Sequence, residues 1–253
     1  MKKLLEKLTQ PATRKKGEDV ADHTTRLFIH IPKTAGTSFR VAAESRFGKR
    51  RVIRDYGPES EATSESVKRD VYDTGNHSGI LQAIEHDQAL MLAGHFPLNK
   101  YGRIIGLQNT VTIFRDPIEQ VISHYRHAAA HHGFEGSLVE FARRKGIRNI
   151  QTRFLCNLDP ALVGIVGLTE SYRETLSLIN QRWGWNLKHQ RKNVSDRFDR
   201  HGVKVSPEER SELAALNRED REIYRRAGQV FRNSTCLLYT SPSPRDLVGN
   251  RVC

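Results

Sequence analysis

Residues 30–39, with the sequence HIPKTAGTSF, combine residue types that proteins use to bind a phosphate or sulfate group. An apolar stretch that predicts a strand precedes them and a predicted helix follows. Backbone N–H groups of the turn should therefore converge at the positive end of the helix dipole. Lys33 supplies a positive charge, and Gly36 lets an anion approach the backbone closely. We predict an oxyanion-binding loop, whose other members are Thr34, Ala35, Thr37 and Ser38.

A second group of candidate binding residues follows another predicted strand, residues 110–114. Arg115 comes directly after the strand, and Ser123 lies six residues beyond Pro117, on the second turn of a predicted helix. Ligands of α/β proteins bind at the carboxyl ends of strands, where a guanidinium and a hydroxyl could hold one phosphate between them. The alternative is that Arg115 and Asp116 only tie neighbouring loops together.

Two histidines adjoin these segments. His95 follows the predicted strand at residues 89–94, within the sequence Gly-His-Phe. A neutral imidazole at a strand end can accept the proton of a substrate hydroxyl at neutral pH, which makes His95 a candidate general base. The alternative is a core histidine bonded to a backbone carbonyl. His30 either supports the oxyanion-binding loop or points into the core.

The order of predicted elements is that of an α/β fold with a mostly parallel central sheet, flanked by helices and followed by a helical C-terminal part. Residues 57–79, rich in Ser, Glu, Thr and Gly, are expected to form a loop or insertion. The expected strands are residues 26–31, 52–56, 89–94, 110–114 and 162–168, and the expected helices are residues 37–47, 81–86, 117–131, 138–144, 149–155, 171–182 and 207–227.

Composition narrows the classes of protein to which the chain can belong. Its 253 residues suit one α/β domain, and a net charge of +12 favours anionic partners without choosing among them. The apolar runs fall far short of the roughly 20 residues that a transmembrane helix needs, and the N-terminus lacks the apolar region of a secretory signal. A cytoplasmic protein is therefore expected. The three cysteines have no metal-ligand spacing.

The two ends of the chain differ from the part between them. Residues 1–24 are polar and basic and are expected to be flexible, although the spacing of Leu4, Leu5 and Leu8 would allow weak peripheral contact with a membrane. Residues 237–253 break the pattern of the chain. Their run TSPSPRD is similar to translated sequencing-adapter sequence, so we expect a non-native tail. The functional domain should therefore comprise residues 25–236.

Taken together, these motifs resemble those of the sulfotransferases that use 3′-phosphoadenosine 5′-phosphosulfate (PAPS), particularly the carbohydrate sulfotransferases related to heparan sulfate 2-O-sulfotransferase. The loop is similar to the family's 5′-phosphosulfate loop, and Gly-His-Phe to the context of its general base. Arg-Asp-Pro, with Ser123 and Tyr125, is similar to the 3′-phosphate motif. Looser similarity at residues 149–156, 167–178 and 217–231 extends the resemblance over about residues 25–232.

The resemblance implies a three-layer P-loop-like fold and transfer of a sulfuryl group from PAPS to a hydroxyl of a carbohydrate. The carbohydrate acceptor could itself be anionic, since the protein is basic. It assigns catalysis to Lys33 and His95. It assigns cofactor binding to the whole loop from Lys33 to Ser38, together with Arg115 and Ser123. Adenosine 3′,5′-bisphosphate would be the product. A transferring sulfuryl group carries less negative charge than a phosphoryl group, so no metal is required.

Other features allow two interpretations each. By the same resemblance, Gln151 and Arg153 are candidates for cofactor or acceptor contacts, with a structural role as the alternative. His127 and His131 have the i, i+4 spacing of a metal site, but no third ligand has suitable spacing, which favours a solvated helix face. Three basic runs could contact an acidic glycan or form plain solvated surface: residues 50–51, 143–145 and 188–192.

Two rival functions remain on the residues alone. A P-loop kinase or nucleotide triphosphatase would also place a lysine in a turn between strand and helix. However, its G-x-x-x-x-G-K-[ST] pattern is missing here, since the lysine comes directly after the proline. A nucleic-acid-binding protein is suggested only by the charge of +12, without a helix-turn-helix, zinc or RNA-recognition signature, so no nucleic-acid partner is expected.

Overall fold

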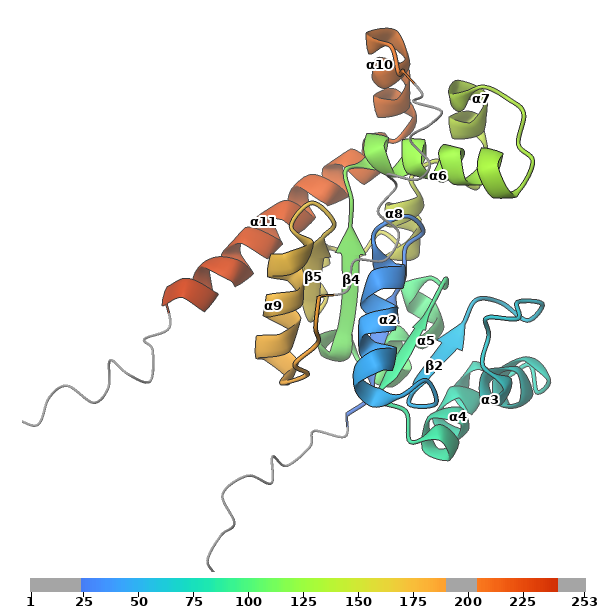
Figure 1. The fold of residues 1–253 in the computed structure, drawn as a ribbon, viewed down its shortest axis with the longest axis vertical. Helices are drawn as coiled ribbons and strands as arrows, with labels where there is room; N and C mark the ends of the chain where they lie inside the picture. Colours follow the sequence, from blue (N-terminus) through green and yellow to red (C-terminus); the bar gives the residue numbers. More distant parts are fainter. Residues whose placement is uncertain (1–23, 190–203, 241–253) are drawn as a thin grey trace, which may run out of the picture.

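The computed structural model describes residues 24–189 and 204–240, whose strands form one parallel sheet (Figure 1). The strand order is β2-β3-β1-β4-β5, and every neighbouring pair is parallel. Almost all strand residues are buried, as expected for a sheet covered on both faces. The strands are β1 (Arg26–Ile29), β2 (Val52–Asp55), β3 (Met91–Gly94), β4 (Thr110–Phe114) and β5 (Ile165–Leu168).

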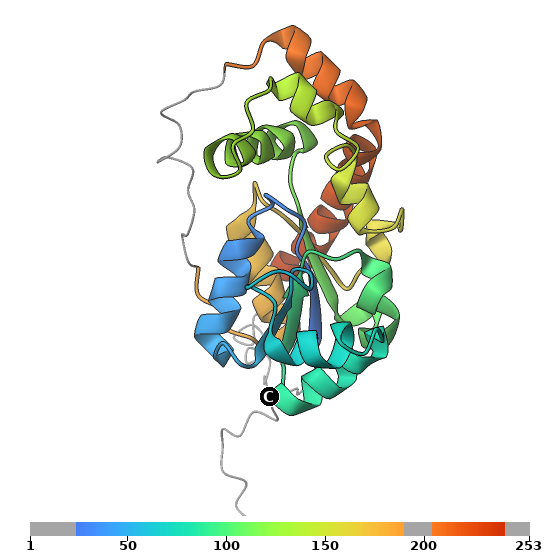
Figure 2. The ribbon, with the colours of Figure 1, turned by 90° about the vertical axis from the view of Figure 1, so that its right-hand side faces the viewer.

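Helices cover both faces of the sheet and complete the three-layer α/β fold that the sequence predicts. The main ones are α2 (Gly36–Phe47), α3 (Glu65–Val67), α4 (Ile80–Asp87), α5 (Leu98–Ile105), α6 (Pro117–His131), α7 (Leu138–Arg143), α8 (Ile150–Phe154), α9 (Tyr172–Trp183), α10 (Pro207–Leu216) and α11 (Arg218–Thr240). Figure 2 shows α2 and α9 on one side of the sheet and α5 and α11 on the other. This arrangement is consistent with a P-loop-like fold.

A smaller group of helices lies beyond the carboxyl ends of the strands. Figures 1 and 2 show α6, α7 and α10 stacked there, above the ends of β1 and β4. These helices have a hydrophobic cluster of their own, separate from the core of the sheet, formed by Val121, Ile122, Ala128, Leu138, Phe141, Ala142, Ile147 and Leu213. Helices α6, α7 and α10 are therefore packed over the end of the sheet at which α/β proteins bind ligands.

The structure corrects three of the predicted elements. The segment at residues 57–79 is not merely a loop, because it contains α3, a π-helical turn (Lys68–Tyr72) and a 3₁₀ turn (His77–Gly79). Helix α5 was not predicted, because Gly102 and polar residues interrupt the apolar pattern of Leu98, Tyr101, Ile104 and Ile105, which are buried or pack against the core. The helix expected at 207–227 is two helices that meet at Asn217, whose side chain donates to the Leu213 carbonyl and accepts from the backbone N–H of Asn149.

The predictions for the two chain ends fall largely outside the described residues. The flexible segment expected at residues 1–24 overlaps the described part only at Thr24, and the tail expected at residues 237–253 overlaps it only in the last turn of α11. Among the described residues, the structure contains no helix with the length and apolar character needed to span a membrane.

A buried carboxylate organises the end of β2. Asp55, which is almost fully buried, accepts hydrogen bonds of 2.7 Å each from the Lys100 ammonium and from the hydroxyls of Tyr72 and Tyr101. Burial alone would raise the pKa of Asp55, but these three donors outweigh it and hold the pKa below its ordinary value of 3.8. The network therefore stabilises the fold above that pH, and its contribution is lost as the pH falls through the lower pKa of the folded state.

We expect Asp55→Ala to lower the free energy of unfolding by about 3–5 kcal/mol at pH 7, because Lys100 would be left buried without its counter-charge. Urea denaturation at pH 7 measures this loss. Glu65→Ala is the matched control, since Glu65 pairs with Lys68 through a side chain that is 86% exposed, and its midpoint should hardly change. Equal midpoints for the two variants would contradict the assigned role of Asp55.

Candidate functional site

The loop between β1 and α2 has a backbone conformation suited to anion binding. Lys33 and Ala35 have positive φ angles of 67° and 64°, and turns of this kind gather successive N–H groups into a concave site. Helix α2 begins at Gly36, so its first N–H groups, which have no partner within the helix, add to the same site. The Thr34 hydroxyl is buried and donates to the Ile31 carbonyl over 2.9 Å, closing the turn from within.

Close packing against His30 explains why the first residue of α2 is glycine. A Cβ atom placed on Gly36 would lie 2.1 Å from Cδ2 of His30, far inside van der Waals contact. The His30 ring is buried, stacks on Phe28 with 5.3 Å between ring centroids, and has its Nδ1 atom 2.9 Å from the Tyr56 hydroxyl. His30 therefore supports the loop from below, which resolves the alternatives that the sequence left open.

Two side chains from the β4–α6 segment hold the loop through hydrogen bonds to its backbone carbonyls. Arg115 follows β4 and donates from Nη1 to the Lys33 carbonyl over 3.1 Å. Gln120, fully buried on α6, donates from Nε2 to the Pro32 carbonyl over 2.9 Å. Since β1 and β4 are neighbouring parallel strands, the two motifs predicted separately from the sequence meet at one place. Sequence reasoning missed Gln120, because a glutamine three residues after Pro117 carries no distinctive signal.

The two cations at this place are held close together and partly buried. Desolvation lowers the pKa of Lys33, and the nearby positive charge of Arg115 lowers it further. Desolvation also lowers the pKa of Arg115, partly offset by the negative charges of Glu170, Glu119 and Asp116. Two half-buried cations that destabilise each other form a site in which a bound polyanion would be favourable.

Gln151 positions Arg115 through its backbone. Its side-chain amide makes two hydrogen bonds to Arg115, accepting from the backbone N–H over 3.1 Å and donating to the carbonyl over 2.8 Å. Gln151 is fully buried in the first turn of α8, where its N–H and that of Thr152 donate to the Asp220 carboxylate over 3.0 Å and 2.7 Å. In this structure Gln151 therefore has a positioning role toward Arg115.

Two further predicted binding residues, Ser123 and Arg153, differ in their surroundings. Ser123 lies half-buried on α6, one turn beyond Gln120, on the part of the helix that faces the loop. Arg153 donates from Nη1 and Nη2 to the carbonyls of Lys145 and Gly146, at 2.6 Å and 2.8 Å, and so holds the turn before α8. Arg153 is exposed, and its contacts in this structure are structural.

His95 lies at the end of β3, beside the loop. Its Nδ1 atom is 2.5 Å from the His30 carbonyl, which can only accept, so Nδ1 carries the proton and Nε2 of the neutral ring has a free lone pair. The ring centroid lies 4.4 Å from that of His30 and 4.7 Å from that of Tyr56. Desolvation by these neighbours lowers the pKa, outweighing the hydrogen bond that raises it, and Arg40 lowers it further. His95 is therefore neutral at pH 7, as a general base requires.

The face of α6 that contacts the loop also carries histidines, for which sequence reasoning considered only a metal site or a solvated surface. Four and seven residues after Gln120, His124 and His127 lie on the same side of the helix. Desolvation and then the charge of Lys33 lower the pKa of each to about 4. No group of three or more potential ligands is placed to hold a metal among residues 24–189 and 204–240.

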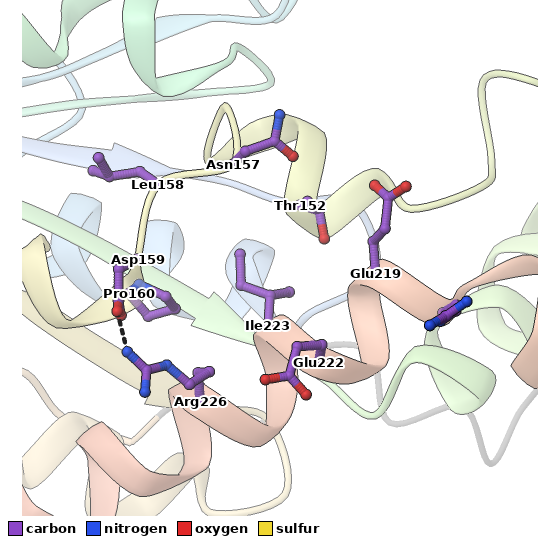
Figure 3. Close-up of a pocket in the computed structure, with 10 residues that line it drawn as sticks. Thr152, Asn157, Leu158, Asp159, Pro160, Glu219, Glu222, Ile223 and Arg226 are labelled. Atoms are coloured by element: carbon purple, nitrogen blue, oxygen red, sulfur yellow. Dashed lines mark hydrogen bonds and ion pairs between the residues drawn. The ribbon is translucent and has the colours of Figure 1, made fainter.

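One cavity lies away from the loop. It has a volume of about 570 Å³ and separates α8 and the turn at 160–162 from the first half of α11 (Figure 3). Arg226 and Asp159 form an ion pair at its edge, and Glu219, Glu222 and Arg218 add charges of both signs. The second cavity, of about 320 Å³, adjoins the histidine face of α6.

Comparison with known proteins adds no assignment to this geometry. No family model matches the chain, and a search of curated proteins finds no match. The fold and the site define an α/β protein of P-loop-like architecture. Lys33, Arg115 and the neutral His95 lie at the carboxyl ends of β1, β4 and β3.

The Gly36–His30 contact makes a stability prediction. We expect Gly36→Ala to lower the free energy of unfolding by about 1–3 kcal/mol, because the added methyl group must displace the His30 ring from its packed position. Urea denaturation measures the change. Gly146→Ala is the control, since a Cβ there meets no atom within 4 Å. A Gly36→Ala protein as stable as wild type would show that the loop is not held against His30.

Proposed function

We propose that the protein is a PAPS-dependent sulfotransferase that transfers a sulfuryl group to a hydroxyl of a carbohydrate. One observation carries the proposal: Arg115 bonds the Lys33 carbonyl, so the two motifs that resemble the 5′-phosphosulfate and 3′-phosphate motifs lie together. A donor with anionic groups at both its 5′ and 3′ positions needs two cationic groups at the same end of the sheet. Lys33 and Arg115 follow the carboxyl ends of β1 and β4 and provide them.

The donor would lie across the ends of β1 and β4. The N–H groups of the loop and the Lys33 ammonium would bind the 5′-phosphosulfate. Arg115 and Ser123, from the end of β4 and from α6, would bind the 3′-phosphate, which distinguishes PAPS from ATP. Gln151 acts on this part indirectly, because it holds the backbone from which the Arg115 side chain extends.

The acceptor hydroxyl would approach sulfur from the side of His95. Its oxygen forms a bond to sulfur while the bond from sulfur to the bridging oxygen of the nucleotide breaks, and its proton passes to Nε2 of His95. The His30 carbonyl holds Nδ1–H and keeps Nε2 available as the acceptor. Lys33 would neutralise the charge that grows on the departing bridging oxygen, so positioning and electrostatic stabilisation supply most of the catalysis.

The rival assignment, a kinase or nucleotide triphosphatase, makes a different prediction about binding. We expect adenosine 3′,5′-bisphosphate to raise the melting temperature of the protein, and ATP with Mg²⁺ to raise it much less, because only the former carries a 3′-phosphate for Arg115. Thermal-shift titration of both ligands tests this. Arg115→Ala should weaken the first effect selectively. A larger shift with ATP and Mg²⁺ would favour the rival.

The catalytic roles make a second prediction. We expect Lys33→Ala to abolish transfer, and His95→Ala to lower the rate by on the order of 10²–10⁴ while donor binding stays nearly intact. The assay is transfer of labelled sulfate from PAPS to a panel of glycans, read by mass spectrometry, with circular dichroism to verify folding. Lys49→Ala, which removes an exposed lysine after α2, is the matched control. Normal turnover by His95→Ala would rule out His95 as the base.

A further inference from the structure

The smaller cavity, which we term the α6–α7 cavity, has basic groups at its rim and an apolar floor. Its volume of about 320 Å³ is within the range of small-ligand sites. Ala128, Phe141 and Ile147 are buried and form the floor. Every titratable residue that lines it is basic or an imidazole, and none is acidic: His124, His132 and Arg144. A ligand group that fits this lining is an oxyanion attached to a less polar body.

His124 connects this cavity with the candidate active site. His124 and Ala128, on successive turns of α6, and His132, directly after the helix, line the cavity. Gln120, one turn before His124 on the same side of α6, bonds the Pro32 carbonyl of the loop. His124 therefore lies at the boundary between the loop and the cavity, close enough to Lys33 that the lysine charge acts on its ring.

The His124 ring has an unused hydrogen-bonding atom. Its Nδ1 is buried and has no hydrogen-bond partner. The ring packs edge-on against Phe141, with 5.4 Å between the centroids, and this contact limits its orientation. Buried ring nitrogens without partners are rare in folded proteins, and each one calls for an explanation such as a bound ligand. The unpartnered atom and the basic rim point to the same kind of occupant.

The charges around His124 come from several elements. Lys33 extends from the loop, His95 from the end of β3, His127 from α6 and His132 from the residue after α6. Arg144, from the turn after α7, lines the same cavity and lies over the Phe141 ring at 5.9 Å. Desolvation first, and the electrostatic influence of Lys33 and the neighbouring histidines second, lower the pKa of His124 to about 4, so the ring is neutral at pH 7. A negative group bound in the cavity would raise the pKa of His124, because it stabilises the charged form of the ring.

We propose that the α6–α7 cavity binds a carboxylate or sulfate group, and that His124 takes up a proton and donates to it when the group binds. This inference rests on the proposed function only for the origin of the anion. The donor's two anionic ends are already assigned to the loop and to Arg115 with Ser123. The acceptor must place a hydroxyl at His95, which lies near enough to His124 to influence its pKa. The structure therefore favours an acidic group of the acceptor.

The direction of the pH effect follows from the proton uptake. Because His124 is neutral in the free protein and charged in the complex, binding should tighten as the pH falls toward 5.5. Because the pKa of His124 is about 4 in the free protein, the affinity gained at pH 5.5 depends on how far above 5.5 the anion raises that pKa, and tenfold tighter binding requires about one unit above it. A neutral ligand of the same shape should show no such increase.

The test is isothermal titration calorimetry at pH 7.5 and 5.5, in two buffers of different ionisation enthalpy, which counts the protons taken up. One ligand is an unsulfated oligosaccharide of alternating glucuronate and N-acetylglucosamine, and the other is its carboxyl-reduced, neutral counterpart. Both are added to protein saturated with adenosine 3′,5′-bisphosphate. We expect proton uptake and at least tenfold tighter binding at pH 5.5 for the charged oligosaccharide only.

Variants identify the residue that takes up the proton when the oligosaccharide binds. His124→Gln should remove the uptake and the pH dependence, and Arg144→Gln should weaken binding but keep the uptake. His77→Gln, which removes a histidine outside the cavity, should behave as wild type. Circular dichroism verifies that each variant is folded. Equal uptake by wild type and His124→Gln in every titration would overturn the proposal, as would equal uptake with the neutral oligosaccharide.

A separate titration identifies the source of the anion. Adenosine 3′,5′-bisphosphate is added to the unliganded protein, and the uptake of His124→Gln is subtracted from that of wild type to remove protons bound by the nucleotide itself. A positive difference in proton uptake would mean that the donor supplies the anion. The cavity would then still be an anion site, but the anion would come from the donor and not from the acceptor. If the nucleotide does not bind at all, the proposed function fails, and the oligosaccharide titration on unliganded protein still tests the cavity.

Discussion

The hydrogen bond from the Arg115 guanidinium to the Lys33 carbonyl joins the ends of two strands and holds a second cation beside the lysine. The arrangement is unfavourable in isolation, since each charge loses solvent and repels the other. It persists because Gln120 and Gln151 fix the backbones on either side, through Pro32 and through Arg115 itself. A preformed pair of cations is what a site needs if it is to bind a polyanion without rearranging.

The far end of the chain contributes to this pair through a chain of polar contacts. Asp220, on the first turn of α11, accepts from the backbone of α8 and from the Thr152 hydroxyl at 2.7 Å. Burial raises the pKa of Asp220, against the effect of these donors. Helix α8 in turn supplies Gln151, which bonds Arg115. The helical C-terminal part is therefore a structural component of the candidate site, although no residue of α11 belongs to the loop.

Histidines beside the loop stay neutral for a common physical reason. Desolvation is the largest influence on His30, His95, His124 and His127, and positive neighbours act in the same direction. The roles of these histidines differ because their hydrogen-bond partners differ. His30 has Tyr56 as a partner and supports the loop, His95 has one nitrogen held by a carbonyl and the other left as a base, and His124 has a buried nitrogen without any partner.

The fold and the loop were largely predictable from local signals. Strands β1 and β4 are short apolar runs, and α6 begins at Pro117, as the sequence predicts; the structure adds Asp116 as its N-cap. Gly36 was predicted to let an anion approach the backbone, whereas the structure shows the His30 ring packed where its Cβ would lie. Helix α5 was missed because Gly102 and polar residues interrupt its apolar pattern, and the break at Asn217 was missed because the Asn217 side chain bonds to Asn149, which is distant in the sequence.

The sequence by itself determined which groups could do chemistry: a lysine in a turn, an arginine after a strand and a histidine after another. Only the tertiary structure decided which of them meet. It turned Thr34 inward, gave Gln151 and Arg153 backbone partners, and brought His124 and Gln120 to the loop. The reason is physical, because residue type fixes what a side chain can donate, accept or protonate, whereas long-range packing fixes its partners and its solvation.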